Sequence, residues 1–274
     1  MTPGDTLLLA IVQGLTEFLP VSSDGHLALV QEWIRRTTGR SLANPLGFDV
    51  LLHLGTLAAV ALYFRADLLR LARECWRGAG TAGSTFEARR EVALMALALV
   101  PTGAIGLLLR PTVHRLMLSP RAVALGIGVT GLVLLASRPF VLAAPRRPEP
   151  SRITALQAIC VGAAQGLAVL PGVSRSGLTI ATGLATGMGA AGAFRFSFLL
   201  SIPAVAGALL VETAFAADPL AGSGWLAAFG ALVSGLVGWM ALGLLAAFLR
   251  SARFHHFAWY CLAVGVLGLT FLPA

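Results

Sequence analysis

Residues 13–26, QGLTEFLPVSSDGH, place several chemically active side chains inside an otherwise apolar N-terminal segment. Glu17 lies four residues after Gln13, so on a helix the two side chains share one face. Pointed together into a polar cavity, the carboxylate and the amide oxygen could hold a hard divalent cation such as Mg²⁺ or Ca²⁺. One carboxylate makes a weak site, so we expect the substrate to add oxygens, as a diphosphate would. The alternative is a helix cap or a structural hydrogen-bond network.

Two serines and a histidine follow the helix-stopping Pro20. The spacing of Ser22 and Ser23 from His26 suits a nucleophile with its base, and a histidine is available as acid or base near neutral pH. The segment also suits a helix N-cap, because Ser23 or Asp24 precedes an apolar run. Both interpretations can hold together, and the local sequence does not decide between them.

A second polar stretch, QGLAVLPGVSRSG, occupies residues 165–177. Arg175 lies where a new helix is expected to start, near Leu178. A helix N-terminus offers backbone N–H groups and the positive end of the dipole, and the guanidinium adds a planar fork that suits phosphate. The pattern favours an anion cradle for phosphate over an arginine that is paired only with Glu17. The other expected cradle groups are Ser174, Ser176, Gly177 and Thr179.

The two stretches are similar to each other. Both run Gln-Gly-Leu, then Pro, then Val-Ser, then Gly, and residues 13–25 and 165–177 have equal lengths. We therefore predict an internal repeat whose two polar loops meet in one site. Asp49 and His53 share a helix face near the outer end of the first predicted span, where they could support this site or line its entrance. Near the C-terminus, an aromatic belt at the membrane surface is expected from Phe257, Trp259 and Tyr260.

The composition indicates a membrane protein that crosses the bilayer several times. Of the 274 residues, 57% are hydrophobic and 12% are charged, against roughly 25% charged in soluble domains. The net charge of +8 does not indicate a nucleic-acid partner, because the arginines form short clusters between apolar segments. Three widely spaced cysteines indicate neither a disulfide framework nor a metal knot.

The apolar pattern predicts six transmembrane helices and two re-entrant hairpins in an all-α fold. Residues 5–34 and 153–192 are apolar but interrupted by proline, glycine and serine, and irregular backbone at membrane depth must be buried in protein or line a wet cavity. We expect helix-loop-helix hairpins there, with eight to ten kinked spans as the alternative. The six spans are expected at 46–64, 91–109, 121–137, 196–216, 225–249 and 257–273.

The placement of arginine predicts the orientation of the chain in the membrane. Segments 65–90, 138–152 and 250–253 are the richer in arginine and form one face, which the positive-inside rule places in the cytoplasm. Segment 65–90 is expected to be a loop. Both termini then lie outside, with the site near the midplane between inverted repeats. We expect one integral membrane domain, 1–274, with a first inverted repeat (1–137), a cytoplasmic linker (138–150) and a second inverted repeat (151–274).

Four segments together resemble the undecaprenyl-diphosphate phosphatases of the bacitracin-resistance type, and the likeness covers essentially the whole chain. The resemblance implies a hydrolase of the bacterial plasma (inner) membrane that removes the terminal phosphate from undecaprenyl diphosphate. That reaction regenerates the lipid carrier for peptidoglycan and gives bacitracin resistance. The resemblance also implies a divalent cation and a site open to the outer, periplasmic face. The segments are QGLTEFLPVSSDGH (13–26), FDVLLHLGTLAAV (48–60), PGVSRSGLT (171–179) and FSFLLSIP (196–203).

Carried over by position, the resemblance assigns Ser23, His26 and Arg175 to catalysis and Glu17 with Gln13 to the metal. Many relatives carry Glu at the position of Gln13, so metal binding here should depend more on Glu17 and on the diphosphate. Many carry Thr or Ser where this chain has Asp24, an extra acid that could join the metal ligands or only cap the helix. The expected phosphate-binding set is Ser22, Ser174, Arg175, Ser176, Gly177 and Thr179.

Two questions stay open at this point. Ser23 could attack phosphorus, or orient a water, with His26 as base and then acid; alternatively His26 is itself the nucleophile. A secondary transporter or flippase for a polyprenyl phosphate lipid would share the architecture, although transport does not require a serine and a histidine that face an arginine. The expected partners are the lipid substrate and membrane lipid, and the oligomeric state, a homodimer included, is left undecided.

Overall fold

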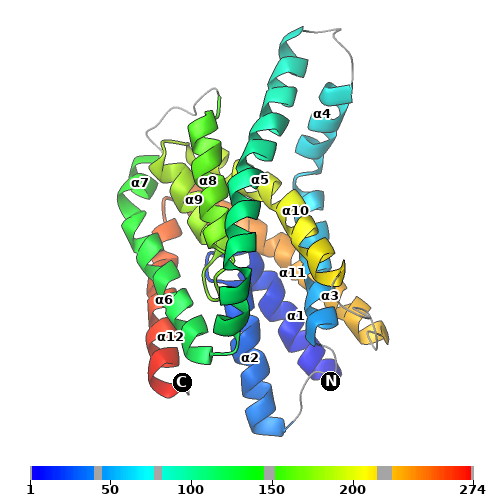
Figure 1. Ribbon diagram of the computed structural model, residues 1–274, viewed down its shortest axis with the longest axis vertical. Coiled ribbons are helices and arrows are strands. Elements are labelled where there is room, and N and C mark those ends of the chain that lie inside the picture. The colour runs from blue at the N-terminus through cyan, green and yellow to red at the C-terminus, as the bar shows by residue number, and fades with distance from the viewer. Residues whose placement is uncertain (1, 40–44, 77–81, 145–151, 215–223, 273–274) are drawn as a thin grey trace.

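The computed structural model describes residues 2–39, 45–76, 82–144, 152–214 and 224–272. Within these ranges the regular structure is helical throughout, as predicted (Figure 1). The helices are α1 (Pro3–Phe18), α2 (Ser23–Thr38), α3 (Pro45–Tyr63), α4 (Arg65–Trp76), α5 (Ala82–Met117), α6 (Pro120–Ala136), α7 (Arg138–Ala143), α8 (Ala155–Leu167), α9 (Arg175–Ala185), α10 (Ala190–Ala214), α11 (Gly224–Arg250) and α12 (Phe257–Phe271).

The first predicted hairpin is confirmed as two half-length helices, α1 and α2. Each has 16 residues, which at 1.5 Å per residue makes roughly 24 Å of helix, short of a hydrocarbon core of about 30 Å. A capping box between Thr2 and Asp5 starts α1, and Pro20 lies in the turn that follows Phe18. Figure 1 shows α1 rising from the N-terminus and α2 returning toward the same end of the molecule.

The second hairpin, α8 and α9, has the same design and is also confirmed. Its helices have 13 and 11 residues, too few to cross a bilayer. A capping box between Thr154 and Gln157 starts α8, and Ser174 caps α9. In Figure 1, α8 enters from the end opposite to the two chain termini, so the two hairpins approach the middle from opposite sides.

Five of the six predicted spans are found as stretches that are long and apolar enough to cross a membrane by themselves. The remaining predicted span, 46–64, falls on α3, which passes the same test only together with α4, across a bend of 71°. The chain is therefore a multi-pass membrane protein. The five single spans are Gly83–Met117, Pro120–Ala143, Ala190–Val211, Gly224–Arg250 and Phe254–Phe271.

Segment 65–90, which was expected to be a loop, is helical over 65–76 and 82–90, and 77–81 lie outside the described residues. It forms α4 and the start of α5, and ion pairs stabilise the two helices against each other. Arg70 bonds Glu74 one turn along α4 at 3.2 Å and Glu91 on α5 at 2.8 Å. Arg195 at the start of α10 adds a 2.6 Å bond to Asp67. The charged residues that predicted a polar loop thus bond one another within α4 and across to α5 and α10.

The helices pair in the manner of an inverted repeat. α1 packs along α11 and its counterpart α8 packs along α5, while α6 and α12, the last helices of the two repeats, pack on each other. Glycines in the two Gln-Gly-Leu motifs permit the equivalent contacts. A Cβ on Gly14 would lie 2.7 Å from the Ser234 carbonyl oxygen, and a Cβ on Gly166 would lie 2.8 Å from the Ile105 Cβ. The motif is thus a packing device in both repeats.

The loop of the second hairpin lies directly on the backbone of α6. Gly172 has a φ of +78°, and a Cβ added there would lie 2.0 Å from the Val123 carbonyl oxygen. Gly126 makes the reverse contact, since its Cβ would lie 1.9 Å from the Pro171 carbonyl oxygen. Only glycine allows this approach, because any side chain would separate the loop from the helix.

We predict that Gly172→Ala destabilises the protein more than Gly39→Ala does. Gly39, which ends α2, has a φ of +68° with nothing within 4 Å of its Cβ position. Alanine there loses about 1–2 kcal/mol through the left-handed conformation alone. At Gly172 the clash adds roughly 1–3 kcal/mol of overpacking. Thermal unfolding of both variants in detergent, followed by circular dichroism, measures the order of the two Tm values. Equal losses would show that the loop does not pack on α6 as described.

Candidate active site

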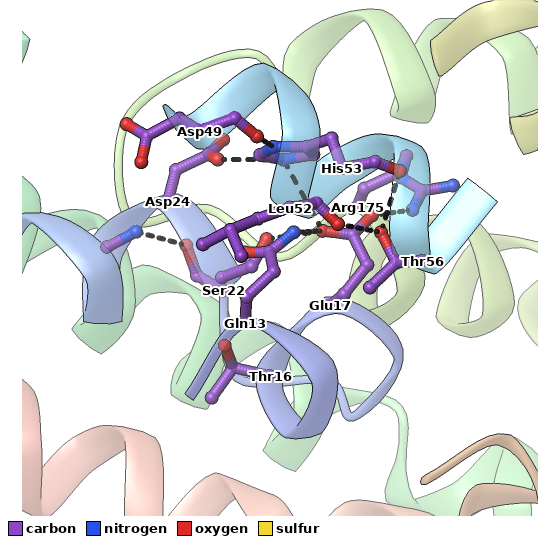
Figure 2. A network of polar contacts seen from close by, with 12 residues as sticks. Gln13, Thr16, Glu17, Ser22, Asp24, Asp49, Leu52, His53, Thr56 and Arg175 are labelled. Atoms are coloured by element: carbon purple, nitrogen blue, oxygen red, sulfur yellow. Dashed lines mark hydrogen bonds and ion pairs between the residues drawn. The ribbon is translucent and has the colours of Figure 1, made fainter. Parts of the chain in front are cut away.

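Glu17 lies at the centre of the polar network between the two hairpins (Figure 2). It is 8% exposed, one residue before the end of α1. One carboxylate oxygen, Oε2, accepts the Ser23 hydroxyl at 2.7 Å and the Gln13 amide Nε2–H at 3.1 Å. The other oxygen, Oε1, accepts a hydrogen bond from Arg175. The carboxylate therefore joins three of the predicted site residues.

Arg175 supplies the link between the repeats. It is the first residue of α9, and its guanidinium Nη2 forms an ion pair with Glu17. A buried charge without a partner is strongly destabilising, so each group stabilises the other in place. The two polar loops therefore meet, as the repeat predicted. The contact also means that Arg175 is paired with Glu17 in this state, which was the stated alternative to a phosphate grip; its phosphate role remains a prediction.

His53 on α3 closes the network from a third side. Its Nδ1 lies 2.8 Å from the Asp49 carbonyl oxygen and therefore carries a hydrogen. Its Nε2 lies 3.6 Å from Glu17 and 3.5 Å from Asp24. The Asp49 carboxylate in turn accepts the Gln31 side chain of α2 at 3.1 Å. The structure thus places Asp49 and His53 beside the site, and their supporting role remains a prediction.

His26 makes its hydrogen bonds with residues other than Ser23. Its Nδ1 lies 2.7 Å from the Ser22 carbonyl oxygen and its Nε2 lies 2.7 Å from the Tyr260 hydroxyl. Ser23 donates instead to Glu17. Among the contacts of the described residues, the acceptor in place for the Ser23 proton is thus a carboxylate rather than the imidazole. Tyr260 was expected in a membrane-surface belt, yet its hydroxyl points into the protein.

The cap of α2 is Ser22, which precedes both of the expected caps, Ser23 and Asp24. Ser22 has a φ of 74°, which brings its hydroxyl oxygen within 3.3 Å of the Gly25 N–H. A left-handed conformation is costly for a residue with a side chain, and the local sequence gives no sign of it. Ser23 is thereby released from capping and becomes the first residue of the helix.

The second loop has a matching cap, and its helix begins earlier than expected. α9 starts at Arg175 rather than near Leu178, because Ser174 accepts the Gly177 N–H at 3.1 Å. Thr179 donates to the Arg175 carbonyl oxygen at 2.8 Å. Ser176 lies 3.3 Å from the Leu19 carbonyl oxygen, which ties α9 to the first loop. These hydroxyls, predicted as phosphate ligands, thus hold the loop in shape in this structure.

Thr130 on α6 is a site-supporting residue that the sequence did not reveal. It is fully buried, and its hydroxyl oxygen accepts the Ser174 N–H at 2.9 Å and lies 3.1 Å from the Gly172 carbonyl oxygen. Backbone groups in a buried loop need such partners. A threonine in an apolar helix has no local pattern that marks this role, so only the fold shows it.

The donor set fits a hard cation only in part. The Gln13 side-chain oxygen Oε1 is buried and lacks a hydrogen-bond partner in the described structure, while the Gln13 nitrogen faces Glu17. An amide oxygen beside a carboxylate suits Mg²⁺ or Ca²⁺. Over the same described ranges, however, no group of three or more His, Cys, Asp or Glu side chains could hold a metal ion. Oxygens from a substrate would be needed to complete the coordination.

Comparison with known proteins matches nearly the whole chain to one family. Residues 6–267 match the family described as bacitracin resistance protein BacA. Undecaprenyl-diphosphatase 2 of Chromobacterium violaceum is 39% identical, over 97% of this chain and 98% of that protein. The undecaprenyl-diphosphatase of Desulfosudis oleivorans is 41% identical, over 97% of each chain, and that of Korarchaeum cryptofilum is 36% identical, over 99% of this chain and 100% of its own. By this end-to-end similarity, the chain belongs to the bacitracin resistance protein BacA family.

Proposed function

We propose that this protein is an undecaprenyl-diphosphatase, which hydrolyses undecaprenyl diphosphate to undecaprenyl phosphate and inorganic phosphate. The observation that carries the proposal is the contact between the two hairpin loops. It brings a serine, a carboxylate and an arginine together at a helix N-terminus, inside a membrane protein whose relatives bear that name. The product is the lipid carrier for peptidoglycan and other envelope polymers, and its regeneration confers bacitracin resistance. The hydrolase names of the relatives favour this function over a transporter or flippase.

Phosphoryl transfer depends chiefly on positioning and on neutralising the charge of the transferred group. Arg175 and the backbone N–H groups at the start of α9 can supply positive charge to the terminal phosphate. A diphosphate that enters competes with Glu17 for the Arg175 guanidinium. When Arg175 exchanges one partner for the other, Glu17 keeps its hydrogen bond to Ser23 through Oε2, and its other oxygen, Oε1, is released.

Ser23 is then placed to act as the nucleophile. Its hydroxyl oxygen attacks the terminal phosphorus, its proton passes to Glu17 and the bond from phosphorus to the bridging oxygen breaks, which releases undecaprenyl phosphate. A water molecule, with His26 as its base, then attacks phosphorus, the bond from phosphorus to the Ser23 oxygen breaks, and Ser23 takes back its proton from Glu17 as inorganic phosphate leaves. The alternative, with His26 as nucleophile, requires the imidazole to leave Tyr260. Rapid-quench trapping of labelled enzyme separates the two: acid-labile label that persists in Ser23→Ala and vanishes in His26→Ala would overturn the serine route.

We also propose a divalent cation, held by Glu17 and Gln13 together with the diphosphate oxygens. The buried and unpartnered Gln13 oxygen supports this placement. Asp24, whose carboxylate lies 3.5 Å from His53 Nε2, is a further candidate ligand of the cation. Such an ion would neutralise charge on the diphosphate.

For location, we propose the bacterial plasma membrane with the site open toward the outer face and both termini outside. Support comes from the distribution of arginine. The end of the molecule opposite to the termini carries α4 and the start of α5, with their dense arginines (Figure 1). The positive-inside rule assigns that end to the cytoplasm.

The first test is Arg175→Lys. Lysine retains a positive charge to pair with Glu17 but lacks the planar fork, so we expect the protein to stay folded while kcat/KM for undecaprenyl diphosphate falls about 10²-fold or more. The value of kcat/KM is measured from phosphate release by the purified protein with Mg²⁺. Arg121→Lys, at an exposed residue that bonds the Leu272 carbonyl oxygen, is the control and should match the wild type. Full activity in Arg175→Lys would contradict the bidentate grip.

A second test is Gln13→Glu, with Gln165→Glu as the matched control in the other repeat. The new carboxylate would lie against Glu17, so we expect a lower Tm without metal and recovery of Tm with Mg²⁺. We also expect half-maximal activity at a lower Mg²⁺ concentration, because a second charged oxygen binds the cation more tightly. Gln165 has no carboxylate four residues later, so its variant should show no gain from Mg²⁺. An inactive Gln13→Glu would indicate that Gln13 binds substrate as a donor.

A further inference from the structure

We propose that Tyr260 is a positioning residue for the reaction, acting through His26. The Ser22 carbonyl oxygen fixes the tautomer of His26, and the Tyr260 hydroxyl holds the remaining ring nitrogen, Nε2, and with it the direction of the imidazole. The inference rests on the proposed phosphatase function and adds to it a residue from the last helix of the second repeat.

The tautomer of His26 follows from its two partners. A backbone carbonyl oxygen can only accept, so Nδ1, 2.7 Å from the Ser22 carbonyl oxygen, carries the hydrogen. In the neutral ring Nε2 then has the lone pair, and the atom facing it at 2.7 Å is the Tyr260 hydroxyl, which donates to it. The rings are also stacked, with centroids 5.6 Å apart and planes 13° from parallel. Tyr260 therefore holds the reactive nitrogen by a hydrogen bond and the ring plane by stacking.

The position of Tyr260 is itself well fixed. The next residue, Cys261, is fully buried, with its sulfur 3.5 Å from the Pro20 carbonyl oxygen in the first hairpin loop. One turn further along α12, Gly265 packs on the backbone of Gly128 in α6. The helix that bears Tyr260 is thus anchored both to the loop before His26 and to the α6 framework.

Exposure distinguishes Tyr260 from the neighbouring belt residues. Trp259 is 63% exposed, as a membrane-facing anchor would be, whereas Tyr260 is 47% exposed and directs its polar end inward. His26 behind it is 9% exposed. Without the hydroxyl, the buried Nε2 would lose its partner, and the imidazole would be held only by the Ser22 carbonyl oxygen and the neighbouring ring. A small misplacement of an acid–base group lowers the rate of the chemical step while leaving the substrate-binding charges in place.

Tyr260→Phe tests this, because phenylalanine keeps the stacked ring and removes only the hydroxyl. We expect kcat for undecaprenyl diphosphate to fall about 10-fold to 100-fold, with KM changed less than about twofold. The control is Tyr63→Phe, at the other tyrosine of the chain, which packs on Phe64 and Phe194. It should keep wild-type kcat and KM. Unchanged kcat in Tyr260→Phe would overturn the proposal.

The route through His26 is tested in a double-variant cycle. Single-turnover rates with enzyme in excess keep slow variants measurable. If Tyr260 acts through His26, then Tyr260→Phe has no further effect on the rate in a His26→Ala background. Rate losses that multiply, or a lower Tm that accounts for the loss in the single variant, would show a structural role and overturn the proposal. A wild-type protein that releases no phosphate would instead refute the proposed function, before the variants are compared.

Discussion

The ion pair between Glu17 and Arg175 is the contact on which the remainder of the site depends. Charged side chains within membrane segments are costly unless they are paired, and these two come from opposite inverted repeats. Glu17 ends one half-helix and Arg175 starts the other. The pairing thereby fixes the distance between the hairpins, and Ser23, Gln13 and His53 are arranged around the same carboxylate.

Irregular backbone at this depth is tolerated because α6 supplies the hydrogen-bond partners that water supplies to loops elsewhere. Gly126 and Gly172 allow the loop of the second hairpin to lie on the helix backbone, and the Thr130 hydroxyl serves the loop's buried N–H and carbonyl groups. Packing and hydrogen bonding thus act on the same few residues. The loop that presents Arg175 is therefore held by a transmembrane helix rather than by its own turns, consistent with the rule that exposed loops do not occur in hydrocarbon.

Much of the fold could be predicted because it depends on patterns that are local in sequence. Helix length against bilayer thickness identified the hairpins, and the repeated Gln-Gly-Leu identified the inverted pair. The four-residue spacing of Gln13 and Glu17 correctly placed them on one face. The partners of Ser23 and His26 could not be predicted in this way. His26 meets Tyr260 across 234 positions of the chain, and Ser23 meets Glu17 across a turn in which Ser22 has a positive φ that the local sequence does not indicate.

The separation of Ser23 from His26 has a consequence for the chemistry of the proposed reaction. A serine hydroxyl bonded to a carboxylate and an imidazole bonded to a phenol are two acid–base systems rather than one. In the proposed reaction, Arg175 releases one oxygen of Glu17 when it turns to a phosphate, while the other oxygen stays bonded to Ser23. Substrate binding and activation of Ser23 are then the same event, because both require Arg175 to exchange partners. In that scheme, the ion pair would keep Ser23 inactive as long as no diphosphate is in the site.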